Sequence, residues 1–153
     1  MGGRPVSPYG FHKDMAEQIC QEFTYFWNVK TCCLRIFSAY GPGLTKQLFW
    51  DLYHKLMQDE NPTLWGTGYE SRDFIYIMDI VKIVELAIMN SSFRCQRLNV
   101  ANGRQIFIKD VAKAVLDCMQ IEKQVSFNQE FRAGDRKNWE ADISIIKKWG
   151  YES

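Results

Sequence analysis

Apolar side chains recur at three- and four-residue steps over residues 9–27, the spacing of one face of an α-helix. This stripe consists of Phe11, Met15, Ile19, Phe23 and Phe26. Cys20 and Trp27 widen it, so we expect the helix to pack on a sheet and also on a further partner. Ser7 is a suitable N-cap and Pro8 a suitable first helical residue, whereas Asn28 is expected to end the helix.

Short apolar runs alternate with further helical patterns along the rest of the chain. Residues 31–37 are mostly apolar, as in a strand that is buried on both faces. Shorter strands are expected at residues 63–65, 74–77, 98–100 and 125–127. Helices are expected at residues 46–58, 80–89, 109–119 and 143–149. Because strands and helices alternate throughout, the predicted fold class is α/β.

The ends of two helices carry their own signals. Asp79 and Asp142 precede helical patterns, and a carboxylate in that position can accept from free backbone N–H groups, so each is expected to be an N-cap. Gly150 stands where a glycine commonly follows the last residue of a helix. Tyr40-Gly41-Pro42-Gly43 is typical of a turn.

Length and charge exclude several classes of protein. The 153 residues fit one ordinary domain, and a net charge of +1 gives no reason to expect a nucleic-acid partner. No apolar run approaches the ~20 residues of a membrane span, so no membrane partner is expected. No apolar segment follows the first five residues, so no signal peptide is expected.

The cysteines indicate a reducing compartment. They are odd in number, contain no Cys-x-x-Cys motif, and are Cys20, Cys32, Cys33, Cys95 and Cys118. We interpret all of them as buried thiols, which predicts a cytoplasmic protein. His12 and His54 have no cysteine or carboxylate partner at ligand spacing, so no metal site is expected.

Tyr9 and Lys13 are the first candidates for chemistry. They lie four residues apart, so a helix would place them on one face. A cation beside a phenol favours the phenolate, so the oxygen could accept or donate a proton near neutral pH. The spacing alone is weak, and an ordinary pair on a helix surface is the alternative interpretation.

Five segments, in order, resemble those of the extended short-chain dehydrogenase/reductases, in the subgroup of nucleotide-sugar epimerases and dehydratases. Residues 7–13 contain that family's Tyr-x-x-x-Lys, and residues 35–43 are similar to its Arg-x-x-Asn-x-Tyr-Gly-Pro. Residues 66–79 resemble its Gly-x-Gly-x-x-x-Arg-Asp-Phe segment. Residues 98–103 are similar to its Asn-x-Gly-x-Gly strand, and residues 132–151 to its Arg-x-Gly-Asp and Leu-Gly-Tyr segments.

The resemblance implies catalytic and cofactor-binding roles for Tyr9 and Lys13. Tyr9 would be the general acid/base that deprotonates a sugar hydroxyl while hydride leaves the sugar carbon for NAD. Lys13 would favour the Tyr9 phenolate and hold the nicotinamide ribose. NAD is the implied cofactor, with NADP as the alternative.

The resemblance also implies a site for a nucleotide-diphosphate sugar. Arg72 and Arg132 would grip the diphosphate, because a planar guanidinium binds phosphate at two oxygens. Asp135 would accept from a nucleotide sugar hydroxyl. Ser38 stands where the family usually has the substrate-contacting Asn, and its shorter side chain weakens that contact or leaves it to water. Charge alone favours another interpretation, in which each arginine pairs with a nearby aspartate at the surface.

The family's Gly-x-x-Gly-x-x-Gly turn, which holds the dinucleotide pyrophosphate, does not occur in this sequence. We therefore expect a C-terminal fragment that lacks the N-terminal Rossmann half. Residues 1–43 would end the Rossmann-type catalytic domain, and residues 44–153 would mainly bind the nucleotide sugar. The missing half and a second copy, joined through the helix at residues 9–27, are the expected protein partners.

The function implied is that of an NAD-dependent nucleotide-sugar 4-epimerase. A 4,6-dehydratase or a related reductase of the same family is the first alternative. An alternative of another class is a catalytically inactive remnant or an oligomerisation module.

Overall fold

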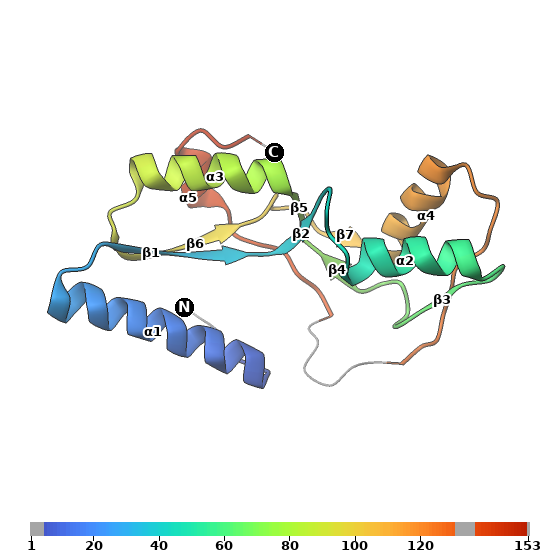
Figure 1. Ribbon diagram of the computed structural model, residues 1–153, viewed down its shortest axis with the longest axis horizontal. Coiled ribbons are helices and arrows are strands. Elements are labelled where there is room, and N and C mark those ends of the chain that lie inside the picture. Colours follow the sequence, from blue (N-terminus) through green and yellow to red (C-terminus); the bar gives the residue numbers. More distant parts are fainter. Residues whose placement is uncertain (1–4, 131–136, 153) are drawn as a thin grey trace.

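Two short parallel strand pairs form the centre of the structure, a computed structural model that describes residues 5–130 and 137–152. Strand β1 (Thr31–Ile36) pairs with β6 (Arg94–Val100), and β2 (Ser38–Tyr40) pairs with β5 (Phe74–Tyr76). Helix α1 (Pro8–Trp27) covers one face of the β1–β6 pair, while α3 (Ile77–Asn90) and α5 (Ser144–Lys148) lie on the other (Figure 1). The predicted α/β class is confirmed.

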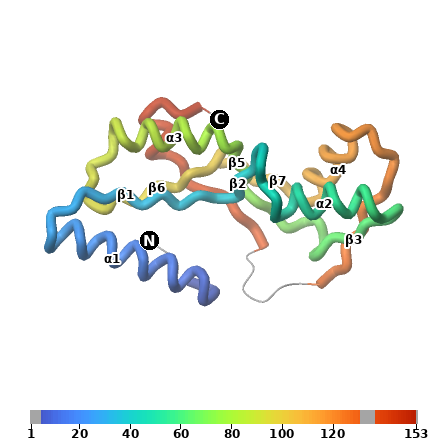
Figure 2. Tube along the Cα trace, in the orientation of Figure 1, coloured from blue at the N-terminus to red at the C-terminus, as the bar shows by residue number. Residues whose placement is uncertain are grey.

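A second group of elements lies beyond the carboxyl ends of these strands (Figure 2). It contains α2 (Gln47–Gln58), α4 (Ile108–Met119) and the parallel pair of β3 (Thr63–Leu64) and β8 (Ser126–Phe127). The antiparallel pair of β4 (Ser71–Arg72) and β7 (Ile106–Phe107) stands between the two groups. The sequence pattern did not indicate β4 or β7, because a two-residue strand is too short to show a period.

Each group of elements has its own apolar core. The first core lies between the central strands and α3 and α5, and its buried residues are Ile75, Ile80, Ile83, Val100, Ala101, Ala141, Ile143, Ile146 and Tyr151. The second core joins α2, α4 and β3 through Leu52, Leu56, Leu64 and Ala112. A cleft lies between the two cores.

The termini of the helices confirm some predictions and correct others. The Ser7 hydroxyl accepts from the Gly10 N–H at 3.1 Å, and Asn28 ends α1 in the left-handed conformation, both as expected. The prediction for Asp79 is wrong, because α3 begins at Ile77 and Asp79 lies within its first turn. There its carboxylate pairs with Lys82 instead of capping the helix.

Asp142 accepts from the start of α5 as predicted, but it lies one residue before the assigned N-cap. The residue assigned as the N-cap of α5 is Ile143, and the helix begins at Ser144. The Asp142 carboxylate nevertheless accepts from the Ser144 N–H at 2.9 Å. That hydrogen bond holds the pKa of Asp142 below its ordinary value. Gly150 follows the C-cap with φ of 92°, as expected of a glycine in this position.

The side of α1 that meets the sheet is polar, which the sequence pattern did not predict. No residue of α1 is buried, and Phe11, Met15, Ile19, Phe23 and Phe26 are all exposed. Strand β1 is correspondingly half-buried or exposed along its length, so the prediction of burial on both faces is wrong. Ion pairs and thiols fill the space under the helix in place of an apolar layer.

The cysteines also differ from their predicted burial. Cys118 is exposed, and the other four are only partly buried free thiols. Three of them lie near one another under α1, where thiols replace the apolar side chains that normally fill such a contact. Within residues 5–130 and 137–152, no helix combines the length and the apolarity needed to cross a bilayer.

Candidate functional site

A cleft of about 690 Å³ lies between the two apolar cores. Its walls come from the end of β1 and the start of β2, from α2, from the segment before Gly66, and from β4 and β5. The carboxyl ends of parallel strands are the usual position of ligand sites in open α/β folds. We call this space the central cleft.

Ser38 and Arg72 both line the central cleft, although 34 positions separate them in the sequence. Strand pairing brings them together, because the Ser38 N–H donates to the carbonyl of Asp73 at 3.1 Å. The Arg72 guanidinium donates to the Ser71 carbonyl at 2.9 Å and is half-buried. The cleft therefore has a hydroxyl and a positive charge on neighbouring strands.

Asp73 is the structural support of this wall. It is fully buried, and its carboxylate accepts from the backbone N–H groups of Asn102, Gly103 and Ala141 at 2.8, 3.0 and 3.2 Å. A buried carboxylate is costly unless it is well hydrogen-bonded, and here backbone donors from two distant segments satisfy it. The residue next to Arg72 thus fastens β5 to the rest of the first core.

The turn before β4 is closed by Glu70. Its carboxylate accepts from the N–H groups of Thr67 and Gly68 and from the Thr67 hydroxyl, at 3.0–3.1 Å. Partial burial by itself would raise the pKa of Glu70, but these hydrogen bonds outweigh it and hold the pKa below its ordinary value. A negative charge at Glu70 therefore fixes the turn that carries one wall of the cleft.

Tyr9 and Lys13 lie outside the central cleft, on the first two turns of α1. The Lys13 ammonium stands 5.4 Å from the centre of the Tyr9 ring, so the two side chains share a face as predicted. Tyr9 is 72% exposed. Helix α1 begins toward the middle of the molecule, so this exposed pair lies at the helix end nearer to the cleft (Figure 1).

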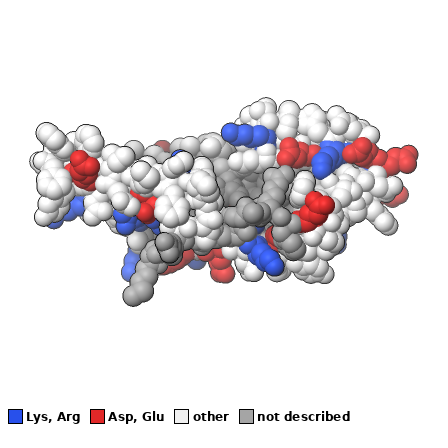
Figure 3. All heavy atoms as spheres, turned by 90° about the horizontal axis from the view of Figure 1, so that it is seen from below, with Lys and Arg blue, Asp and Glu red and all other residues white. Residues whose placement is uncertain are grey.

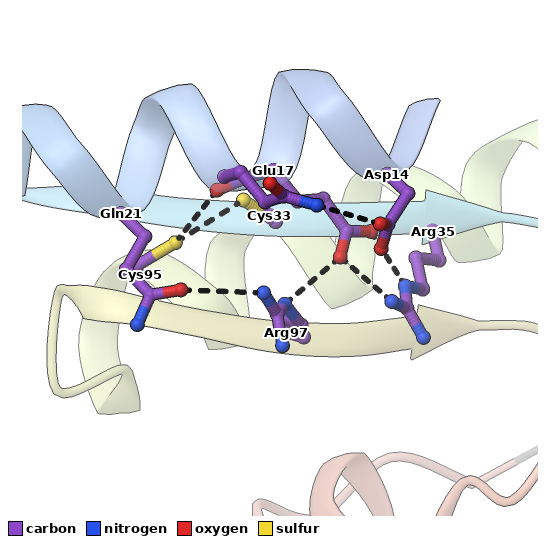
Figure 4. A network of polar contacts seen from close by, with 8 residues as sticks. Asp14, Glu17, Gln21, Cys33, Arg35, Cys95 and Arg97 are labelled. Carbon is purple, nitrogen blue, oxygen red and sulfur yellow. Dashed lines mark hydrogen bonds and ion pairs between the residues drawn. The ribbon is translucent and has the colours of Figure 1, made fainter. Parts of the chain in front are cut away.

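An ion-pair cluster fixes α1 on the strands. The Glu17 carboxylate accepts two hydrogen bonds from Arg35 at 2.6 Å each, and Arg97 pairs with it at 2.8 Å. Figure 4 shows the two arginines rising from β1 and β6 toward the helix. Because the Glu17 side chain is only 12% exposed, these pairs are better shielded than ordinary surface ion pairs. They hold the helix that carries Tyr9 and Lys13.

Arg132 and Asp135 lie outside the described residues. The cleft has further lining residues that the sequence analysis did not single out, namely Trp65, Lys137 and Trp139. Trp139 packs edge-to-face on Phe37 with ring centres 5.5 Å apart, and its indole N–H is buried without a hydrogen-bond partner in the described part of the chain. The only available signal was that Trp65 directly precedes the recognised segment at residues 66–79, and that Lys137 and Trp139 lie within the one at residues 132–151.

Comparison with known proteins agrees with this arrangement. The family model described as "NAD dependent epimerase/dehydratase family" matches residues 2–101. The "Uncharacterized UDP-glucose epimerase YtcB" of Bacillus subtilis (strain 168) is 28% identical over 145 residues, which are 94% of this chain and 46% of that protein. The chain thus spans about half the length of the curated relatives it matches.

Solved structures show the same fold. A UDP-glucuronic acid 4-epimerase from Bacillus cereus, in complex with UDP-glucuronic acid and NAD, matches with a TM-score of 0.87 and 25% identity. The match covers 97% of this chain and 48% of that one. A UDP-N-acetylglucosamine 4-epimerase from Methanobrevibacter ruminantium M1, in complex with UDP-N-acetylmuramic acid, has a TM-score of 0.84 and 27% identity. That match covers 97% of this chain and 49% of the other.

Proposed function

Because the chain belongs to the NAD dependent epimerase/dehydratase family, we propose that it supplies the substrate-binding part of an NAD-dependent nucleotide-sugar 4-epimerase. The observation that carries this proposal is the central cleft, in which Ser38 and Arg72 lie on neighbouring strands. The 4-epimerases among its relatives and structural neighbours support the choice of reaction.

The chemistry assigned to the chain's own residues is binding and proton transfer. Arg72 binds the diphosphate of a nucleotide sugar, since a guanidinium can donate to two phosphate oxygens at once. Ser38 contributes a hydroxyl beside it, and Arg132 and Asp135 complete the contacts to phosphate and to a sugar hydroxyl. The Tyr9 phenol oxygen takes the proton of the sugar hydroxyl and later returns it.

Tyr9 and Lys13 fit the nicotinamide end of NAD, because both side chains are exposed on one face of α1 and the ammonium lies near the phenol ring. When bound, NAD supplies the acceptor for the hydride that leaves the sugar carbon. The pyrophosphate of the cofactor needs a glycine-rich turn, and this sequence contains none. We therefore propose that a separate Rossmann half provides that turn, with residues 1–43 completing its catalytic domain and residues 44–153 mainly binding the sugar nucleotide.

Calorimetric titration of the 153-residue chain with UDP tests the assignment of the cleft. We expect saturable binding of UDP, and a loss of about tenfold to a hundredfold in affinity when Arg72 is replaced by alanine, because one charge-assisted contact is lost. Arg94→Ala is the matched control, since Arg94 is an exposed arginine that does not line the cleft. NAD is expected to produce no saturable heat up to millimolar concentration.

Two outcomes of that titration would contradict the proposal. Equal losses of UDP affinity in Arg72→Ala and Arg94→Ala would show that Arg72 does not bind the diphosphate. Micromolar NAD binding by the chain alone would show that the cofactor site does not depend on a glycine-rich turn.

We also propose that α1 is the contact between two copies of the chain. Its outer side exposes a continuous apolar stripe, and Phe26 and Trp27 are 74% and 68% exposed. Figure 3, a view from the side of α1, shows that this end of the molecule is mostly uncharged. Each large apolar side chain that becomes buried contributes about 1.5–3 kcal/mol, so covering several of them strongly favours association.

Analytical ultracentrifugation tests this contact. We expect the chain to self-associate and Phe26→Asp to shift it toward monomer. Ile88→Asp is the control, because Ile88 is also an exposed apolar residue, at 65%, but lies on α3. A monomer at every concentration, or dissociation by Ile88→Asp and not by Phe26→Asp, would refute the proposed contact.

A further inference from the structure

Two cysteines from distant parts of the sequence meet under α1. The sulfur atoms of Cys33 on β1 and Cys95 on β6 lie 3.7 Å apart, and 62 positions separate the residues in the chain. Both are free thiols. Figure 4 shows the two sulfur atoms facing each other between the helix and the strands, beside the ion-pair cluster of Glu17.

A β-bulge creates this contact. The β1–β6 register pairs Thr31 with Arg94 and then Cys32 with Gln96, which leaves Cys95 as an extra residue. Cys95 has φ of 54°, a left-handed conformation that is uncommon outside glycine. A bulge re-aims the side chain of its extra residue, and here the Cys95 thiol points to Cys33 instead of following the regular ladder.

The two cysteines differ in their position relative to a groove on the surface. Cys95 lines an open groove of about 530 Å³ at the C-terminal end of α1, whereas Cys33 does not line it. The same groove is bordered by Lys30 and Arg94, both exposed cations that attract an anionic molecule. A small disulfide with carboxylate groups can therefore enter the groove that Cys95 lines and that Cys33 does not line.

We propose that Cys33 and Cys95 form a redox-active thiol pair, in which Cys95 is modified first by an anionic low-molecular-weight disulfide and Cys33 then closes an intramolecular disulfide. In the first step the Cys95 thiolate attacks one sulfur of the small disulfide and releases one small thiol. In the second step the Cys33 thiol loses its proton and attacks the Cys95 sulfur, which releases the second small thiol. Overall the two cysteines lose two hydrogens, and one small disulfide becomes two small thiols.

The environment of Cys33 agrees with this order. Burial, together with the neighbouring thiols of Cys95 and Cys20, raises the pKa of Cys33 to about 12. Cys33 is therefore a thiol at neutral pH and a poor first nucleophile. It reacts only after Cys95 carries the mixed disulfide, when the attacked sulfur already lies next to it. This inference does not depend on the proposed enzymatic function.

Formation of the disulfide would change the contact with α1. The Cys95 thiol donates to the Glu17 carbonyl with a sulfur–oxygen distance of 3.5 Å, and the oxidised pair has no S–H to donate. In place of that hydrogen bond, a disulfide between Cys33 and Cys95 would link β1 covalently to β6. Closing a long loop of the chain in this way restricts the unfolded state, so the oxidised chain is expected to melt at a higher temperature.

The test treats the native 153-residue chain with glutathione disulfide and maps the products by mass spectrometry. We expect one dominant cross-link, Cys33–Cys95, with the mass of two hydrogens lost, and its disappearance when the sample is first unfolded in urea. Cys33→Ala is expected to stop at a glutathione adduct on Cys95, and Cys95→Ala to leave Cys33 unmodified. Cys118→Ala, which changes the exposed cysteine of α4, is the control and should leave the cross-link unchanged.

Reversing the charge of a residue that borders the groove tests the first step, in which an anionic disulfide approaches Cys95, separately from the closure by Cys33. Arg94→Glu is expected to slow the reaction with glutathione disulfide about three- to tenfold, while the reaction with uncharged hydroxyethyl disulfide stays the same. The wild-type cross-link needs no variant, so it decides the proposal even if a substitution impairs folding. A dominant pair other than Cys33–Cys95, or a Cys33→Ala chain with no adduct on Cys95, would overturn the inference.

Discussion

Replacing Tyr9 by phenylalanine is expected to lower turnover about 10²–10⁴-fold, the usual cost of losing a general acid/base. The change removes only the phenol oxygen and keeps the ring against which Lys13 lies. The measurement requires the chain to be assembled with a Rossmann half that carries the glycine-rich turn. UDP-sugars are then supplied as substrates, and products are separated by chromatography and mass.

Tyr25→Phe is the matched control for this substitution. Tyr25 lies on the same helix and is 82% exposed, so Tyr25→Phe shows whether the loss of a tyrosine hydroxyl from α1 lowers activity in general. A 4-epimerase product keeps the mass of its substrate, whereas a dehydratase product has lost water, so the same assay separates the two reactions. Retention of more than a third of wild-type activity by Tyr9→Phe would show that Tyr9 is not the proton-transferring residue.

Replacing Asp73 by asparagine is expected to cost about 2–4 kcal/mol of unfolding free energy. The buried carboxylate accepts from three backbone N–H groups, those of Asn102, Gly103 and Ala141. An amide has only one accepting oxygen, and its NH₂ group would face N–H donors, so at least one buried donor loses its partner. Urea unfolding followed by circular dichroism measures the loss.

Asp79→Asn makes the same chemical change at a solvent-accessible ion pair. Asp79 pairs with Lys82 on α3, and an exposed pair of this kind contributes about 0–1 kcal/mol. We expect Asp73→Asn to unfold at a clearly lower urea concentration than Asp79→Asn, and also to weaken UDP binding, because Asp73 fixes the strand that continues from Arg72. Equal midpoints for the two variants would mean that the backbone donors around Asp73 find other partners.

Local signals determined the parts of the fold that depend on neighbouring residues. The N-cap at Ser7 and the end of α1 at Asn28 follow from side chains within three residues of the helix ends, and both are confirmed. The helix expected at residues 46–58 is likewise observed as α2, in which Leu52 and Leu56, four residues apart, are buried. The motif segments were sufficient to indicate the family, because their order along the chain carries information that no single motif has.

The interactions that only the tertiary structure decided are those between distant residues. The partners of Asp73 lie 29, 30 and 68 positions away, so nothing local could show that its carboxylate is buried. Helix α1 presents Glu17 to arginines on two strands, which leaves its apolar stripe outside. The sequence by itself determined that this stripe exists, but which side of the helix meets the sheet depends on charges that come from β1 and β6.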